Sequence, residues 1–200
     1  RMNFGALRVL NDDRVEAGKG FGTHPHKNME IISIPLKGKL KHGDSNKNSR
    51  TITIGDIQTM SAGTGIYHSE MNGSDTEPVE FLQIWVMPEK LNTPPAYQDY
   101  DIRPFLRKNE LALIVSPDGD APAKMLQQTW FSIGEIEAGK KIGYHMHQSH
   151  AGVYIFVIEG EVKVDDTVLS RRDGMGVYDT HSFELETLKD SHILLMEVPM

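Results

Sequence analysis

The same pattern occurs twice in this chain, and the repeat limits what the chain can fold into. Two histidines separated by one residue stand at residues 24–26, and a strand-like run with a central glycine follows at residues 36–41. About 121 residues later, a second histidine pair at residues 145–147 is followed by a matching run at residues 158–163. Solenoids repeat every 20 to 50 residues or so, whereas a repeat on this scale indicates two similar domains.

Short β-type segments with turns between them fill most of the sequence. The clearest segments are residues 29–36, 51–54 and 79–86, which are rich in β-branched and aromatic side chains. Polar turns such as residues 44–49 separate them, and little of the chain has the period of an amphipathic helix. This pattern is typical of antiparallel barrels and jelly rolls, so the predicted fold class is all-β.

Two local predictions concern the edges of the first domain. Residues 3–10 predict a strand that the polar residues 11–13 end by turn chemistry. Residues 87–103 contain three prolines and favour an extended segment that crosses between the domains rather than a strand of a sheet. The predicted organisation is a first domain over residues 1–87, a connector over residues 88–103 and a second domain over residues 104–200.

Composition excludes several kinds of partner and site. A chain of 200 residues with 38% hydrophobic content can bury a core, and its net charge of -7 argues against binding to nucleic-acid phosphates or anionic lipid. Cysteine is absent, so disulfides and thiolate metal sites are excluded. No apolar run approaches the roughly 20 residues that span a bilayer, and no signal peptide opens the chain. We therefore expect a cytoplasmic protein that binds neither nucleic acid directly nor a membrane.

The candidate site consists of histidines and glutamates on two segments. Side chains two residues apart on a strand share a face, so His24 and His26 point the same way, and Glu30 has the same parity. His68 and Glu70 form a second pair with this spacing. If the two segments are neighbouring strands, four or five ligands converge, which suits Fe(II), Mn, Co, Ni, Cu or Zn. The alternative is that these side chains are solvated loop residues.

These residues resemble the pirin family of the cupin superfamily. The resemblance is carried by residues 22–30, 55–63, 68–70 and 82–86. It implies a bicupin, in which two antiparallel jelly-roll barrels lie face to face in one chain and the first barrel alone holds a metal ion, most often iron. Pirin-like proteins also extend ahead of the point where this chain begins. We expect either that a segment completing the first barrel precedes the given sequence or that the chain departs from the family here.

The resemblance also assigns roles to individual residues. Ordinary cupins use a glutamate at the place of Glu30, which we expect to support the ligands rather than to act as a fifth ligand. Gln83 and Tyr67 are further candidates for such support, although each is also an ordinary strand residue and Tyr67 is interpreted as one. Carried over position by position, the metal ligands of the family fall on His24, His26, His68 and Glu70.

The second half departs from this pattern. It has no carboxylate at the place that corresponds to Glu30, and a histidine returns seven residues after Gly174, compared with thirteen residues between Gly55 and His68. The spacing that returns a ligand is therefore lost. The remaining histidines are interpreted as structural, with an adventitious ion as the alternative: His145, His147 and His150.

The activity that the resemblance implies is quercetin 2,3-dioxygenase, which cleaves the ring of a flavonol with dioxygen and releases carbon monoxide. A metal ion with open positions can hold an enol or phenol beside dioxygen, and Glu70 would accept the proton of the substrate. Two alternatives remain: a metal- or redox-responsive regulator that binds a protein partner, and a purely structural ion. We expect a monomer, because a bicupin already pairs two barrels. The sequence identifies neither the physiological substrate nor the metal.

Overall fold

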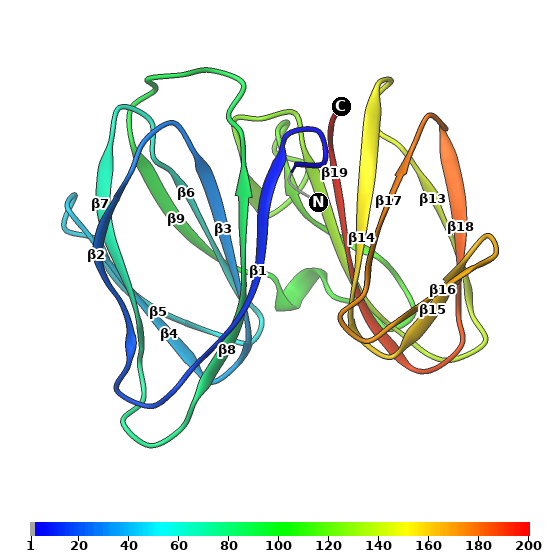
Figure 1. Cartoon of the computed structure of the whole chain (residues 1–200), viewed down its shortest axis with the longest axis horizontal. Coiled ribbons are helices and arrows are strands. Elements are labelled where there is room, and N and C mark those ends of the chain that lie inside the picture. The colour runs from blue at the N-terminus through cyan, green and yellow to red at the C-terminus, as the bar shows by residue number, and fades with distance from the viewer. Residues whose placement is uncertain (1–2) are drawn as a thin grey trace.

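Two β domains lie side by side in the computed structural model, which describes residues 3–200 (Figure 1). Each domain is built from two sheets, and the pairings are antiparallel apart from the short contact of β10 with β11. The single described helix is a short 3-10 turn, η1 (Arg103–Phe105), at the junction of the domains. The predicted all-β, two-domain fold is confirmed.

The first domain packs a five-stranded sheet of order β1-β8-β3-β6-β9 against a four-stranded sheet of order β2-β7-β4-β5. Apolar side chains from both sheets fill the space between them, among them Ile31, Ile66 and Phe81. The strands are β1 (Leu7–Val15), β2 (Gly20–His26), β3 (Glu30–Lys37), β4 (Lys39–Asp44), β5 (Ser49–Thr53), β6 (Asp56–Ser61), β7 (Ile66–Asn72), β8 (Val79–Val86) and β9 (Ala96–Asp101).

The second domain repeats this arrangement, as the duplicated sequence pattern predicts. Its smaller sheet has the order β13-β18-β15-β16, which corresponds to β2-β7-β4-β5, and its larger sheet has the order β11-β10-β12-β19-β14-β17. The strands are β10 (Ala112–Ser116), β11 (Ala123–Lys124), β12 (Trp130–Ile136), β13 (Lys141–His145), β14 (Ala151–Glu159), β15 (Glu161–Val164), β16 (Thr167–Ser170), β17 (Gly174–Tyr178), β18 (Ser182–Thr187) and β19 (Ser191–Pro199).

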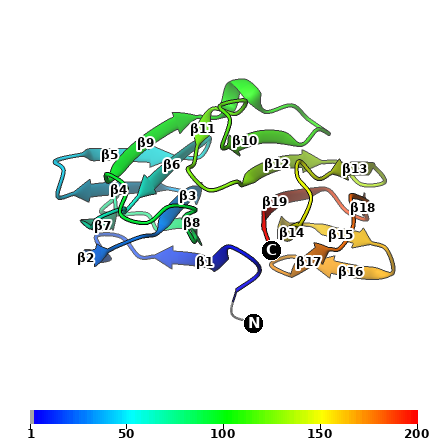
Figure 2. The same cartoon turned by 90° about the horizontal axis from the view of Figure 1, so that it is seen from above.

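The two larger sheets meet in the middle of the molecule, and the smaller sheets lie at its ends (Figures 1 and 2). One apolar cluster joins the domains and contains Ile32 and Ile34 from β3 as well as Ile114 and Leu194 from the second domain. Since one face of β3 lines its own domain and the other lines this cluster, nearly the whole strand is buried. This explains why residues 29–36 are apolar without strict alternation.

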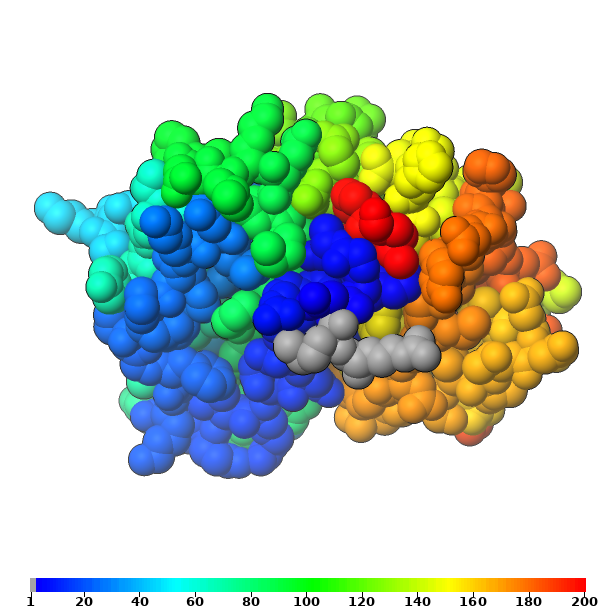
Figure 3. Space-filling view, turned by 45° about the horizontal axis from the view of Figure 1, so that its top comes forward, coloured from blue at the N-terminus to red at the C-terminus, as the bar shows by residue number. Residues whose placement is uncertain are grey.

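The first described residues of the chain and its C-terminal residues also lie together over the junction of the domains (Figure 3). The N–H of Ala6 donates to the carbonyl of Pro199 at 2.8 Å, and the carbonyl of Ala6 accepts from Met87 at 2.8 Å. The described N-terminal segment therefore links β19 of the second domain to the residue that follows β8 of the first.

Two predictions about local structure are wrong. Residues 11–13 do not end the first strand, because β1 continues to Val15 and pairs with β8 throughout, so the ladder outweighs local turn preference. Residues 96–101 of the predicted connector form β9, which pairs with β6 at the edge of the larger sheet. The prolines of this segment lie ahead of β9 and not within it. They therefore remove no hydrogen bond from the ladder with β6. The connector thus contributes a strand to the first domain.

Within residues 3–200 there is no helix of the length and apolar character that crossing a membrane requires. The cytoplasmic location stays a prediction.

Candidate metal centre

Three histidine rings meet where β2 pairs with β7. His24 and His68 are direct partners in the ladder, and His26 lies two residues along β2. The ring centroids of His24 and His68 are 4.5 Å apart, and His26 lies 4.8 Å from each. One nitrogen from each ring lies within 4.8 Å of the other two. The structure therefore brings together three of the four predicted ligands.

The free nitrogens of these rings face one another. Nδ1 of His24 lies 2.8 Å from the carbonyl oxygen of Gly22, so this ring donates its hydrogen there and keeps a lone pair on Nε2. That atom lies 3.0 Å from Nε2 of His68, and Nε2 of His26 is buried with no hydrogen-bond partner among the described residues. A cation that accepts lone pairs would satisfy these nitrogens, so the residues fit a divalent metal ion.

Burial keeps two of the rings uncharged at neutral pH. Together with repulsion from neighbouring rings such as His24, burial lowers the pKa of His26 to about 4 and the pKa of His68 to about 3. Neutral imidazole is the form that binds a metal. His68 is buried, whereas His24 and His26 are half-exposed, so a ligand can reach the cluster from the side of β2.

Glu70 lies two residues beyond His68 on β7 and is only 1% exposed. Its Oε1 accepts hydrogen bonds of 2.8 Å from Oγ of Ser33 and from Nε2 of Gln58, and its Oε2 accepts one from Gln83. Burial raises the pKa of Glu70, although the hydrogen bonds from Ser33 and Gln83 oppose this. The carboxylate is thus engaged by β3, β6 and β8. One of its oxygens lies within 4.8 Å of a nitrogen of His68 and of a nitrogen of His42, but it does not group with His24 and His26 in the described structure.

Gln83 contacts both a candidate ligand and a neighbouring aromatic ring. Besides donating to Glu70, it accepts a 2.8 Å hydrogen bond from the indole Nε1 of Trp85. The indole in turn meets the ring of His26 edge-on, with centroids 4.9 Å apart. Gln83 therefore occupies the supporting position that the sequence suggests, and Trp85 extends this support to His26.

Glu30 does not lie beside the ligands, which corrects the prediction for this residue. A loop with Asn28 in the left-handed conformation (φ 51°) separates β2 from β3, so the alternation of side chains starts afresh at Glu30. Its carboxylate faces the second domain and accepts 2.8 Å hydrogen bonds from the backbone N–H groups of Leu126 and Gln127. Tyr67 is 56% exposed and supports no ligand.

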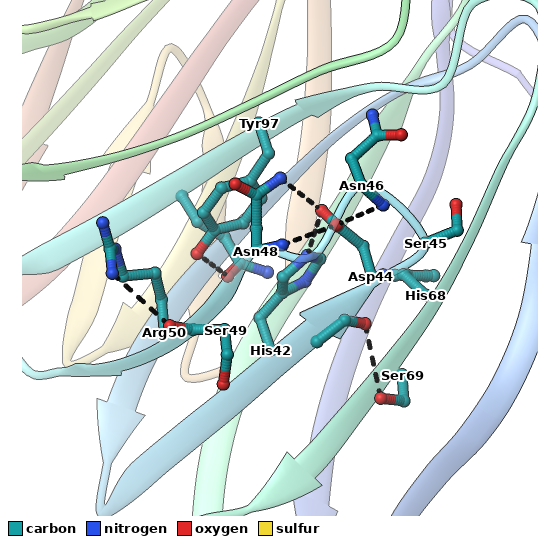
Figure 4. A network of polar contacts seen from close by, with 12 residues as sticks. His42, Asp44, Ser45, Asn46, Asn48, Ser49, Arg50, His68, Ser69 and Tyr97 are labelled. Atoms are coloured by element: carbon teal, nitrogen blue, oxygen red, sulfur yellow. Dashed lines mark hydrogen bonds and ion pairs between the residues drawn. The ribbon is translucent and has the colours of Figure 1, made fainter.

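A fourth histidine, His42 on β4, lies next to His68 (Figure 4) and is absent from the residues that the sequence suggests. It is fully buried, its ring centroid is 5.4 Å from that of His68, and its Nε2 lies 3.1 Å from Oδ2 of Asp44. Tyr97 stacks on it with centroids 4.2 Å apart. In the sequence, the spacing of two residues between Leu40 and His42 indicates only that both side chains share one face of a strand. The pairing of β4 with β7 is what brings His42 to the site.

The second domain uses its histidines differently. Nδ1 of His147 lies 2.8 Å from the buried carboxylate of Glu197, to which Tyr144 also donates at 2.9 Å. Trp130 stacks on the His147 ring with centroids 5.0 Å apart. The side chain of His145 is exposed. In the described part of this domain, no three metal-binding side chains converge.

Two similar antiparallel domains in one chain, of which the first carries a histidine cluster suited to a metal, define the class of bicupins. Family profiles identify the kind of bicupin: the profile described as Pirin matches residues 1–86, and the profile described as Quercetinase C-terminal cupin domain matches residues 113–198. The chain belongs to the pirin family, as the resemblance of its motifs predicts.

Relatives of this chain are similar to it over almost its whole length. A quercetin 2,3-dioxygenase of Escherichia coli K12 is 38% identical, with 99% of this chain and 84% of that protein covered. A putative quercetin 2,3-dioxygenase of Zymomonas mobilis is 36% identical, with 98% and 83% covered. The crystal structure of the bacterial pirin YhhW of Escherichia coli in complex with nickel(II) superposes with a TM-score of 0.92 at 36% identity, covering 99% of this chain and 84% of that one.

Proposed function

We propose that this protein is a metal-dependent dioxygenase that cleaves the ring of a flavonol or a similar enol or phenol. The observation that supports this best is the half-exposed cluster of three imidazoles, whose lone pairs face one another with no hydrogen-bond partner for His26. Two relatives, one named quercetin 2,3-dioxygenase and one putative quercetin 2,3-dioxygenase, are 38% and 36% identical to this chain. The proposed activity is therefore an oxidation with dioxygen rather than a hydrolysis.

His24, His26 and His68 would hold the ion, with Glu70 as the fourth ligand. Fe(II) is our first candidate, and nickel(II) is the alternative because a related bacterial pirin binds it. When bound, such an ion supplies Lewis acidity toward an enol hydroxyl and redox chemistry with dioxygen.

The side chains of this protein would bind the substrate and move its proton. Because His24 and His26 form the exposed rim, the substrate would enter past β2. Ser33 and Gln58 both hold Oε1 of Glu70, so Oε2 is the oxygen that would accept the hydroxyl proton of the substrate. Gln83 donates a hydrogen bond to that oxygen, and this hydrogen bond would break as the oxygen takes up the proton.

Oxygen uptake and carbon monoxide release with quercetin test this function. We expect both in the metal-loaded protein and neither in His68→Ala, which loses a ligand. Glu70→Gln removes the proton acceptor, and we expect it to lower kcat by about 10²- to 10⁴-fold, the usual contribution of a general base. A metal-loaded protein without oxygen uptake would contradict the dioxygenase and favour a regulator or a structural ion.

A further inference from the structure

His42 and His68 share an incomplete set of hydrogen bonds. Nδ1 of His42 and Nδ1 of His68 are both buried, and neither has a hydrogen-bond partner among the described residues. Buried ring nitrogens usually have a partner, either in the protein or in an ordered water molecule. Two such atoms on neighbouring rings therefore call for a common explanation.

The strand pairing places these two rings within reach of each other. β4 and β7 are neighbours, with His42 opposite Glu70 and Asp44 opposite His68. The rings are tilted by 48°, and a nitrogen of each ring and an oxygen of Glu70 all lie within 4.8 Å of one another. At this separation, a rotation of the rings or one bridging water molecule can join a nitrogen of one ring to a nitrogen of the other.

The hydrogen on the His42 ring can be assigned from its other contact. The carboxylate of Asp44 accepts hydrogen bonds from the backbone N–H groups of Asn46 and Asn48 at 2.9 and 3.0 Å, and from the side chain of Asn48 at 2.9 Å (Figure 4). An ionised carboxylate only accepts, so Nε2 of His42 is the donor in its 3.1 Å contact with Asp44. In the neutral ring Nδ1 is then an acceptor, and the stack with Tyr97 fixes the plane of the ring.

We propose that His42 is a positioning residue for the candidate metal ligand His68. Its Nδ1 accepts the hydrogen on Nδ1 of His68, directly or through one water molecule, and this leaves the Nε2 lone pair of His68 for the ion. His42 would thus accept the Nδ1 hydrogen of His68, just as the carbonyl oxygen of Gly22 accepts the Nδ1 hydrogen of His24. Partners of this kind orient a metal-binding imidazole and increase its basicity. The inference rests on the metal centre of the proposed function and not on the reaction.

Two substitutions of His42 separate a hydrogen-bonding role from a packing role. Asparagine places its amide near the position of Nδ1, whereas glutamine reaches the position of Nε2 and leaves the Nδ1 position empty. Both remove the stack on Tyr97. We expect His42→Gln to weaken the affinity for Ni(II) by about 10- to 100-fold, as loss of such a partner typically does, and His42→Asn to stay close to wild type. Competition with a chelator measures the affinity without any substrate.

Three results would overturn the proposal. Equal Ni(II) affinity in all three proteins means that His42 does not act on the site, and equal weakening in both variants means that only packing matters. A Co(II) absorption spectrum showing one nitrogen ligand fewer in both variants means that His42 binds the ion itself.

A measurement on the wild-type protein keeps the test independent of how the variants fold. Long-range proton–nitrogen correlation spectra of the metal-free protein show which ring nitrogen carries the hydrogen. We expect Nε2 of His42 to carry the hydrogen of that ring, which leaves Nδ1 as the acceptor, and a hydrogen on Nδ1 of His42 would overturn the proposal. Lack of oxygen uptake with quercetin would contradict the proposed enzyme but would leave both of these readouts unchanged, so the two failures are distinguishable.

Discussion

Each imidazole of the candidate centre owes its metal-binding form to its surroundings. A backbone carbonyl assigns the hydrogen of His24, while burial disfavours the charged forms of His26 and His68. A cluster of neutral rings with converging lone pairs is poorly satisfied without a cation. The protonation state and the orientation of these rings therefore suit an ion better than a hydrogen-bonding network.

The depressed pKa of His26 predicts how the stability of the metal-free protein depends on pH. The unfolded ring takes up a proton near pH 6.5, but the folded ring does so only near pH 4. Its contribution to stability is present above pH 6.5 and is lost as the pH falls from 6.5 toward 4. As the pH falls from 7.5 to 5, we expect the free energy of unfolding to decrease less in His26→Gln than in wild type. Urea unfolding at both pH values measures this. Parallel curves for the two proteins would contradict this.

The elements that carry the site explain which residues the sequence can reveal. His24, His26 and His68 follow from the alternation of side chains within single strands, and Gln83 from the family motif. Alternation is not kept across the loop between β2 and β3, so the parity of Glu30 is misleading.

The residues that stay hidden depend on how strands pair. His42 reaches the site through the neighbour of its own strand, a contact that no spacing in the sequence encodes. The full length of β1 and the presence of β9 escape prediction for a similar reason, since hydrogen bonds from β8 and β6 override the turn preference of residues 11–13 and the effect of nearby prolines.

The position of Glu30 at the start of β3 predicts a structural role between the domains. In Glu30→Ala the backbone N–H groups of Leu126 and Gln127 lose their buried acceptor, which should lower the free energy of unfolding by about 1–3 kcal/mol. Metal content should not change. Urea unfolding and metal analysis measure both, with the exposed Glu89→Ala as the control. Loss of the metal in Glu30→Ala would contradict this role and would indicate that Glu30 supports or binds the ion.

Among the described residues, the largest apolar cluster contains side chains of both domains and lies between them. Ile34 of the first domain and Leu194 of the second belong to this cluster, so neither larger sheet keeps its apolar face covered if the other unfolds. The monomeric state and a protein partner stay predictions.

This arrangement predicts that the two domains unfold together. Trp85 lies in the first domain and Trp130 in the second, so Trp85→Phe and Trp130→Phe each leave one fluorescent reporter. In metal-free protein, we expect Leu194→Ala to cost about 2–5 kcal/mol and to shift the unfolding midpoint of both reporters equally. Two separate midpoints, with only Trp130 responding, would show that the domains are independent.

The central claim is that the three-histidine cluster holds the metal, and the number of ions bound per chain tests it most directly. Metal-free protein would be dialysed against Fe(II) without oxygen, or against Ni(II), and the bound metal counted for wild type, His68→Ala and His145→Ala. We predict one ion per chain in wild type and in His145→Ala, and none in His68→Ala. An ion that persists in His68→Ala, or that disappears in His145→Ala, would contradict the assignment of the site.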